Sequence, residues 1–174
     1  MRKILLSEIA IYHGQIKMPE YFEIDRKTIF HHMLQEGVTE EIKETPFSRE
    51  LDKLRAYIRE HIFIKHNIIL QELGTESDFY FPHERSKPIN HMNPMNPTES
   101  PDYVCLYGVN VGKDSCRIII EYNNNRIKGC VKEMNLNNND FVLFPSTLKY
   151  HIDKNRSEQL NSILFITYLK KNEL

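Results

Sequence analysis

The sequence has no tryptophan, only six glycines and only three cysteines, which are Cys105, Cys116 and Cys130. The cysteines are odd in number and widely spaced, so they fit neither a disulfide framework nor a Cys-x-x-Cys zinc pattern. We therefore expect reduced thiols packed within strands, and a protein of the cytoplasm.

Neither sign of charge is in excess, since 23 lysines and arginines stand against 24 aspartates and glutamates. Nucleic acid and anionic membranes are therefore not expected partners. Long hydrophobic runs are also lacking, because Ser7, Glu8 and His13 interrupt the apolar stretch at residues 1–16. We expect neither a signal peptide nor a membrane span, which needs roughly 18 consecutive apolar residues.

A length of 174 residues is ordinary for one domain, so we expect residues 1–174 to fold as a single unit. Residues 1–81 would form a supporting region of strand and helix. Residues 82–102 contain five prolines, too many for a helix or a central strand, and are expected to form a long ordered loop. Residues 103–174 would form the β core.

Two helices are expected in the N-terminal region. The first spans residues 25–36, with Asp25 as N-cap and Gly37 as the left-handed residue after its end. The second has Thr45 as cap and Pro46 at the first helical position. Its apolar residues recur at spacings of three and four, which predicts a stripe buried against a sheet: Phe47, Leu51, Leu54, Ile58 and Ile62. Histidines on these helices are expected at the surface: His31, His32, His61 and His66.

From residue 68 onward the apolar pattern has a period of two, which predicts strands. One earlier strand is expected at residues 8–16, and residues 68–73 and 78–81 are expected to pair through a turn at 74–77. Six more strands are typical of a closed or sandwiched β unit: 103–111, 116–122, 128–134, 141–144, 149–152 and 163–169. The expected class is α+β, mainly β, with two N-terminal helices packed on a barrel.

Two segments carry a resemblance to a known family. One is the triplet His91-Met92-Asn93 ahead of the strand at 103–111, and the other is the turn Asn-Asp-Phe-Val-Leu-Phe-Pro-Ser at 139–146, followed by His151. Over residues 82–169 the chain resembles the prolyl-hydroxylase-type 2-oxoglutarate/Fe(II) oxygenases, and more closely still the small oxygenase-like proteins encoded by marine tailed phages. The resemblance implies a double-stranded β-helix, a jelly-roll or cupin-like barrel.

In that family a His-x-Asp pair and a distal histidine hold ferrous iron on one face, which leaves positions open for 2-oxoglutarate and dioxygen. The resemblance assigns His91 and His151 as metal ligands, with Asn93 at the place of the carboxylate. Glu99 or Asp102 from the same loop could supply the acid instead. A neutral amide offsets the charge of the metal less than a carboxylate does, so Asn93→Asp is expected to increase iron affinity if Asn93 occupies that place.

The arginine that binds the cosubstrate in this family follows the distal histidine by about ten residues, and here Asn161 or Ser162 stands at its place. We expect Tyr107 and Arg117 as anchors for 2-oxoglutarate, and Arg126 or Arg156 as substitutes from other segments. Simpler readings stay open, since an aromatic residue on a strand is usually core and an outward arginine is an ordinary surface cation.

Two functions are therefore open. The first is a hydroxylase of weak or lost activity that uses Fe(II) and 2-oxoglutarate on a small-molecule or protein substrate. The second is a catalytically inactive barrel that acts as a structural or partner-binding module, for example as a homo-oligomer or with a virion partner in a phage particle. The setting is the host cytoplasm or the virion. Convergence of His91, Asn93 and His151 at the barrel mouth would favour the first function, and an apolar barrel without them the second.

Overall fold

The computed structural model describes residues 9–17, 23–38, 48–93, 95–122 and 129–171. Its elements follow the order β1 (Tyr12–Gln15), α1 (Arg26–Val38), α2 (Arg49–His66), β2 (Ile69–Tyr80), the 3-10 helix η1 (Pro97–Glu99), β3 (Tyr103–Asn110), β4 (Arg117–Tyr122), β5 (Cys130–Asn135), β6 (Asp140–Pro145), β7 (Lys149–Ile152) and β8 (Asn161–Lys171). The α+β, mainly β class is confirmed, and β3 to β8 lie within a few residues of their expected bounds.

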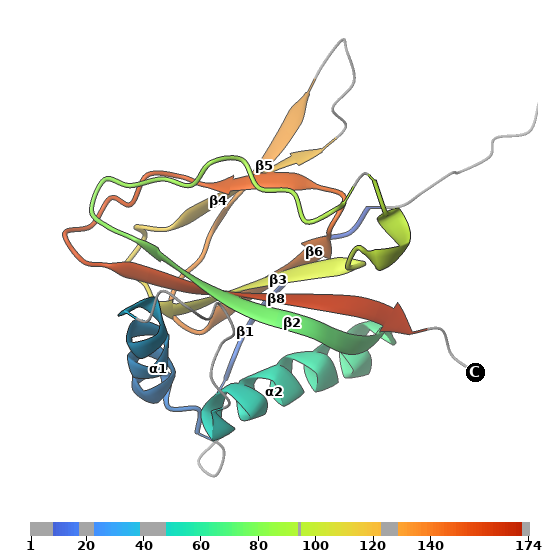
Figure 1. Cartoon of the computed structure of the whole chain (residues 1–174), viewed down its shortest axis with the longest axis horizontal. Coiled ribbons are helices and arrows are strands. Elements are labelled where there is room, and N and C mark those ends of the chain that lie inside the picture. The colour runs from blue at the N-terminus through green and yellow to red at the C-terminus, as the bar shows by residue number, and fades with distance from the viewer. Residues whose placement is uncertain (1–8, 18–22, 39–47, 94, 123–128, 172–174) are drawn as a thin grey trace, which may run out of the picture.

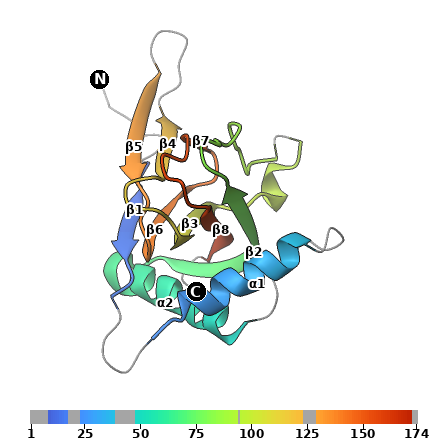
Figure 2. The ribbon, with the colours of Figure 1, turned by 90° about the vertical axis from the view of Figure 1, so that its left-hand side faces the viewer.

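The strands form two antiparallel sheets. The larger has the order β1-β6-β3-β8-β2, and the smaller has the order β5-β4-β7. Both helices lie beneath the five-stranded sheet and the three-stranded sheet lies above it (Figure 1), and the rotated view again places both helices at the bottom (Figure 2). The molecule therefore has a layer of helices and two layers of strands.

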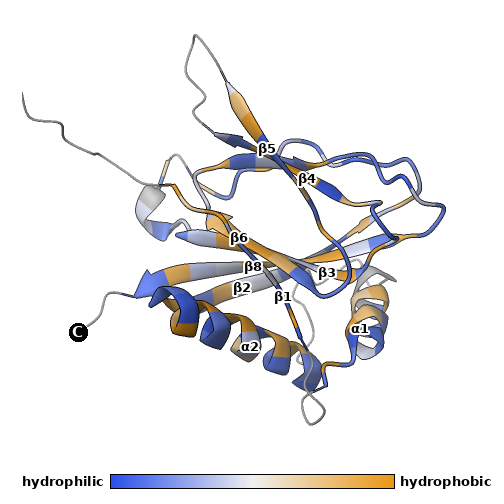
Figure 3. Cartoon of the chain, turned by 180° about the vertical axis from the view of Figure 1, so that it is seen from behind, coloured by the Kyte–Doolittle hydropathy of each residue, from blue (hydrophilic) through white to orange (hydrophobic). Residues whose placement is uncertain are grey.

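Each face of the five-stranded sheet carries its own core. In β3, Cys105 and Tyr107 pack with residues of the helices, in what we call the helix-side core, whereas Val104 and Leu106 pack between the sheets, in the inter-sheet core. Successive side chains of a strand point to opposite faces. Apolar residues accordingly run along the strands at the centre of the molecule (Figure 3).

Helix α2 lays its expected stripe on the sheet. Leu51, Leu54, Ile58 and Ile62 are all buried in the helix-side core. The helix begins later than expected, because Ser48 takes the extended N-cap conformation, with φ −127° and ψ 128°. Thr45, Pro46 and Phe47 lie outside the described residues. The helix ends at Asn67, which adopts the left-handed conformation and donates its backbone N–H to Phe63 O.

Helix α1 is capped as expected. The Oδ1 atom of Asp25 accepts the backbone N–H groups of Lys27 and Thr28. The hydrogen bond from the Thr28 hydroxyl first, and then these backbone hydrogen bonds, lower the pKa of the Asp25 carboxyl. The helix continues to Val38, so Gly37 lies inside it and is not the residue after its end.

Strand β2 is one long strand, and the hairpin expected at residues 68–81 is wrong. All of β2 pairs with β8, and the register shifts between Glu72 and Gly74, where a bulge interrupts the ladder. One extra residue reverses which side chains face which way. Leu70 therefore packs in the helix-side core while Tyr80 packs in the inter-sheet core, although both have even numbers.

The three cysteines are free, and Cys105 and Cys116 are buried. Burial raises the pKa of the Cys116 thiol to about 12, so this group behaves as an apolar core residue and not as a nucleophile. Among the residues that the structure describes, no helix is long and apolar enough to span a membrane.

Candidate functional site

Strand β7 presents Tyr150, and not His151, to the inter-sheet core. Tyr150 and Ile152 are buried there, whereas His151 is half-buried and pairs with Ile119 of β4. Because side chains alternate along a strand, His151 lies on the outer face of the three-stranded sheet. The inward position of β7 is therefore held by the phenol of Tyr150, and the predicted distal histidine, His151, is the next residue and points outward.

The loop after β2 brings His91 to the ring of Tyr150. Ile89 and Tyr150 exchange two backbone hydrogen bonds, with N···O distances of 2.7 and 3.1 Å, and these fix the loop to β7. His91 Nε2 lies 2.8 Å from the Tyr150 hydroxyl, and the two rings are stacked with their centroids 5.8 Å apart. His91 and His151 therefore lie on opposite sides of β7.

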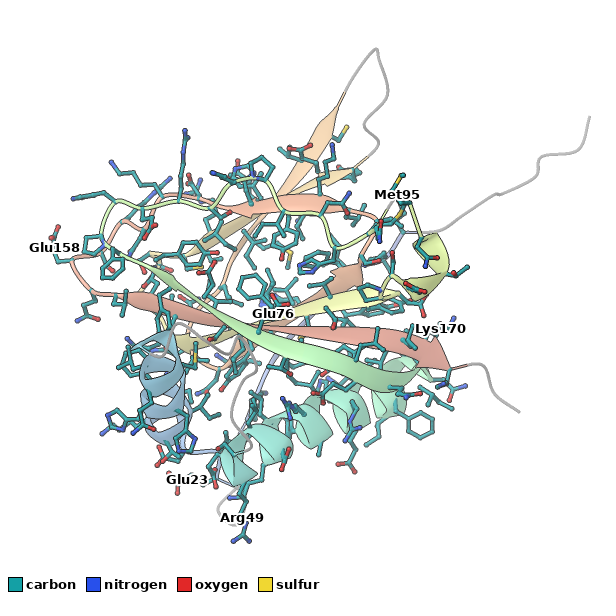
Figure 4. The ribbon with its side chains drawn as sticks, in the orientation of Figure 1. Glu23, Arg49, Glu76, Met95, Glu158 and Lys170 are labelled. Carbon is teal, nitrogen blue, oxygen red and sulfur yellow. The ribbon has the colours of Figure 1, made fainter. Side chains whose placement is uncertain are left out.

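Two acids on β2 border this pair. Glu76 and Asp78 share with Tyr80 the face of β2 that turns toward the inter-sheet core, and Glu76 lies at the middle of the strand (Figure 4). The Tyr80 hydroxyl donates to Asp78 Oδ2 at 2.7 Å. Burial first, and then the negative charge of Asp78, raises the pKa of both Tyr80 and Tyr150. Both phenols are therefore neutral at physiological pH.

Asn93 holds the local turn of its own loop. Its Oδ1 atom accepts the backbone N–H of Met95 at 3.0 Å, and its backbone N–H donates to Ser100 Oγ at 2.7 Å. The side chain is exposed. The amide oxygen expected to stand in for a metal-binding carboxylate is therefore engaged in an Asx-type turn.

The two alternative acids of the loop also lie at the surface. Glu99 is exposed in η1, and Asp102 is exposed with its Oδ2 atom accepting the backbone N–H of Lys170 at 2.7 Å. Asp102 thus fixes the end of β8 to the loop.

The two expected anchors for 2-oxoglutarate face away from the inter-sheet core. Tyr107 is buried in the helix-side core, where its hydroxyl donates to Asn139 Oδ1 at 2.9 Å and burial raises its pKa. Arg117 alternates with the inward Ile118 and pairs with Glu133 Oε2 at 2.9 Å on the outer face of the small sheet. Tyr107 is therefore surrounded as a core aromatic residue is, and Arg117 as an outward-facing surface cation is.

Asn161, which stands at the place of the family's cosubstrate arginine, and Arg156, one of the two substitute arginines, are engaged in other contacts. Asn161 accepts hydrogen bonds at Oδ1 from the Gly112 backbone N–H and the Ser115 hydroxyl, both at 3.0 Å. Arg156 is exposed and pairs with Asp153 at 2.9 Å, and Arg126 lies outside the described residues.

Sequence reasoning missed Tyr150, although the chain carries a signal for it. Apolar residues alternate with polar ones along the segment Leu148, Lys149, Tyr150, His151, Ile152 and Asp153, which places residue 150 inside and residue 151 outside. His83, which the sequence did not assign, lies three residues after the end of β2. It is exposed, has a φ of 68°, and Arg85 takes the place that an acid would hold in a His-x-Asp pair.

The side chains of this region do not fit ferrous iron. Such a site needs two imidazoles and one carboxylate on one face of the ion. Within the described ranges, no three His, Cys, Asp or Glu side chains lie close enough to hold a metal ion. His91 already contacts the Tyr150 hydroxyl, and His151 lies across the strand.

No family model and no curated protein sequence matches this chain. Solved structures do match. A prolyl-4-hydroxylase from Pseudomonas putida superposes with a TM-score of 0.62 at 9% identity, over 93% of this chain and 88% of that one. The viral collagen prolyl hydroxylase of Paramecium Bursaria Chlorella virus-1, solved as a 2OG complex, gives 0.62 at 10% identity, over 93% and 97%. The carbocyclase SnoK from nogalamycin biosynthesis, described as alpha ketoglutarate dependent, gives 0.62 at 11% identity, over 92% and 80%.

Identities this low establish the fold alone. The chain has the fold of the 2-oxoglutarate/Fe(II) oxygenases, with prolyl hydroxylases among its structural neighbours. The resemblance seen in the sequence is therefore confirmed at the level of the fold, while the residues that line the inter-sheet core are those described above.

The half-buried imidazole of His91 predicts a loss of stability in mild acid. Burial lowers its pKa below the ordinary value of 6.5, with Glu76 opposing the shift, so the unfolded state binds a proton before the folded state does. The contribution of neutral His91 to the free energy of unfolding is fully present above pH 6.5. It is lost as the pH falls from there through the lower pKa of the folded state.

Chemical denaturation between pH 8 and pH 5 measures this effect. The free energy of unfolding of the wild type should decline more steeply below pH 6.5 than that of His91→Gln, a difference that carboxylates titrating at lower pH do not produce. Parallel profiles for the two proteins would contradict the assignment.

Proposed function

We propose that this chain is a catalytically inactive protein with the oxygenase fold, in which the two sheets form a double-stranded β-helix that serves as a structural or partner-binding module. The observation that carries the proposal is the contact between Tyr150 and His91. A neutral phenol is a poor ligand for iron. Here the Tyr150 hydroxyl is hydrogen-bonded to His91 Nε2, the nitrogen that an iron site would need.

Aromatic packing around Tyr150 supports the same reading. The Phe144 ring meets the Tyr150 ring edge-on with centroids 5.0 Å apart, and Phe165 stacks on it at 6.5 Å. Phe144 and Tyr150 are fully buried and Phe165 nearly so. Such an aromatic cluster stabilises the packing of the two sheets against each other. In this proposal, the region between the sheets is hydrophobic core and not a site that holds substrate or cofactor.

A hydroxylase of weak activity is the rival function, and it needs His91, a second imidazole and an acid on one side of β7. It also needs an anchor for 2-oxoglutarate on that side, but Tyr107 and Arg117 belong to other faces. Activity would therefore require a different register of β7 together with a new path for the loop before β3.

An iron titration by calorimetry under argon, paired with an assay of succinate release from 2-oxoglutarate, tests the proposal. We expect no saturable Fe(II) binding and no succinate from the wild type, whereas an active prolyl hydroxylase run in parallel gives both. Asn93→Asp should behave as the wild type does, because the side chain at this position is held in its own turn. Tight iron binding with turnover by the wild type would contradict the proposal, and iron binding by Asn93→Asp alone would restore Asn93 as the degenerate ligand.

A further inference from the structure

A hollow of about 460 Å³ lies between β1 and α2, on the opposite side of the five-stranded sheet from Tyr150. Strand β1 contributes its length and Lys17 just beyond it, α2 contributes the stretch from Tyr57 to His66, and Phe141 of β6 forms part of the wall. Phe141 belongs to the helix-side core, whereas its neighbour Val142 faces the inter-sheet core. Strand β1 runs down beside β6 toward α2 (Figure 2).

The charge of this hollow differs from that of the whole chain. Its described lining includes His13, Lys17, His61, Lys65 and His66, and none of the described lining residues is Asp or Glu. The full sequence has nearly equal numbers of acidic and basic residues. Basic groups are thus concentrated here from two separate elements, which favours an anion.

Flat rings make up much of the remaining wall. Tyr12 and His66 lie with their ring centroids 4.5 Å apart, Tyr57 stacks on His61 at 5.7 Å, and His61 meets the edge of Phe141 at 5.8 Å. A methyl group on Gly14 would overlap the Phe141 ring, so the absence of a side chain at residue 14 lets this ring pack directly against β1. These surfaces suit a planar group.

Lys65 and His66 have a simpler role as well, since basic residues in the last turn of a helix offset the partial negative charge of its C-terminus. That role does not explain His13 and Lys17, which come from the strand opposite, nor the space between the two elements.

We propose that this hollow binds a small phosphate-bearing ligand with a planar ring, of which a nucleoside monophosphate is the simplest type. The lysines and histidines bind the phosphate, and the half-buried rings of Tyr12 and Tyr57 contact the planar group. The volume lies within the range of small-molecule sites, roughly 300–1,000 Å³. The site is separate from the inter-sheet core, so it does not depend on the function proposed above.

Binding should be accompanied by proton uptake at His61. Burial, and then the nearby Lys65 and His66, lower the pKa of His61, so this imidazole is neutral at pH 7. The other titratable groups around it are Tyr57 on α2 and Tyr12, His13 and Lys17 on the β1 side. A bound phosphate offsets the surrounding positive charge and favours the protonated form, so binding takes up a proton.

Calorimetric titrations with AMP, adenosine and inorganic phosphate at pH 6 and pH 8 test the proposal. We expect AMP to bind roughly tenfold or more tightly than either fragment, because charge-assisted hydrogen bonds and stacking contribute together. Proton uptake beyond that of the AMP phosphate itself should be visible in buffers of different ionisation enthalpy.

Lys17→Ala and Lys65→Ala supply the matched test, since both lysines are exposed and their loss leaves the core intact. Each should weaken AMP binding roughly tenfold, whereas Lys132→Ala on β5 should not. Lys17→Ala should leave the melting temperature unchanged, and Lys65→Ala should lower it only slightly, because Lys65 offsets the partial negative charge of the α2 C-terminus. Absence of AMP binding at pH 6 by the folded wild type, equal affinity of the lysine variants, or equal affinity for inorganic phosphate and AMP would each overturn the proposal as stated.

Discussion

Ile58→Ala is expected to lower the free energy of unfolding by about 2–5 kcal/mol. Ile58 is 0% exposed at the middle of the α2 stripe, where it packs in the helix-side core. Its replacement removes buried methyl and methylene groups and leaves a cavity that a helix fixed on a sheet closes only in part. Urea denaturation of both proteins measures the difference.

Ile64→Ala is the matched control, because Ile64 belongs to the same helix but is 71% exposed. Its cost should stay within about 0.5 kcal/mol, as for other surface substitutions. Equal costs at positions 58 and 64 would mean that α2 does not cover the sheet through the stripe, and the assignment of the helix-side core would then be incorrect.

Gly108→Ala is expected to be destabilising by about 1–3 kcal/mol or more. A Cβ atom on Gly108 would overlap the carbonyl oxygen of Asn137 and would lie 3.1 Å from its carbonyl carbon. The backbone N–H of Asn139 also donates to Gly108 O at 3.1 Å, so the turn before β6 presses directly on β3. Backbone atoms fixed on both sides cannot move aside as a flexible side chain can.

Gly74→Ala serves as its control. A Cβ atom there would meet only Thr167 Oγ1, at an ordinary contact distance of 3.6 Å, and no described glycine has a positive φ. This variant should therefore be neutral, or more stable by about 0.4–1 kcal/mol through the smaller entropy of its unfolded chain. Thermal and urea denaturation of both variants settle the comparison, and a mild effect at Gly108 would contradict the close approach of the turn.

The burial of a histidine could not be predicted from residue type and helical position alone. His61 was expected on a solvated helix face, yet it is half-buried against Phe141 and borders the hollow between β1 and α2. A helical pattern identifies the apolar stripe but not the partner beside that stripe. The partner here is β1, whose pairing with β6 joins residues more than 120 positions apart.

The candidate iron site shows the same limit for strands. The turn ahead of β7 was recognisable in the sequence, and so was the histidine after it. A shift of one residue nevertheless exchanges the inward and outward faces of a strand. Tyr150 therefore lies inside beside His91, and His151 lies outside beside Ile119.

Local patterns in the sequence determined the class of the fold, the capped start of α1, the buried stripe of α2 and the positions of β3 to β8. These features depend on neighbours within one or two turns or strand repeats, so periodicity and capping residues are sufficient to specify them. The tertiary structure alone decided that β2 is a single bulged strand along β8, that Tyr150 occupies the inward position next to His91, and that basic residues of β1 and α2 surround one hollow. Each of these depends on contacts between residues far apart in the chain, where a bulge or a register change of one residue reverses the outcome.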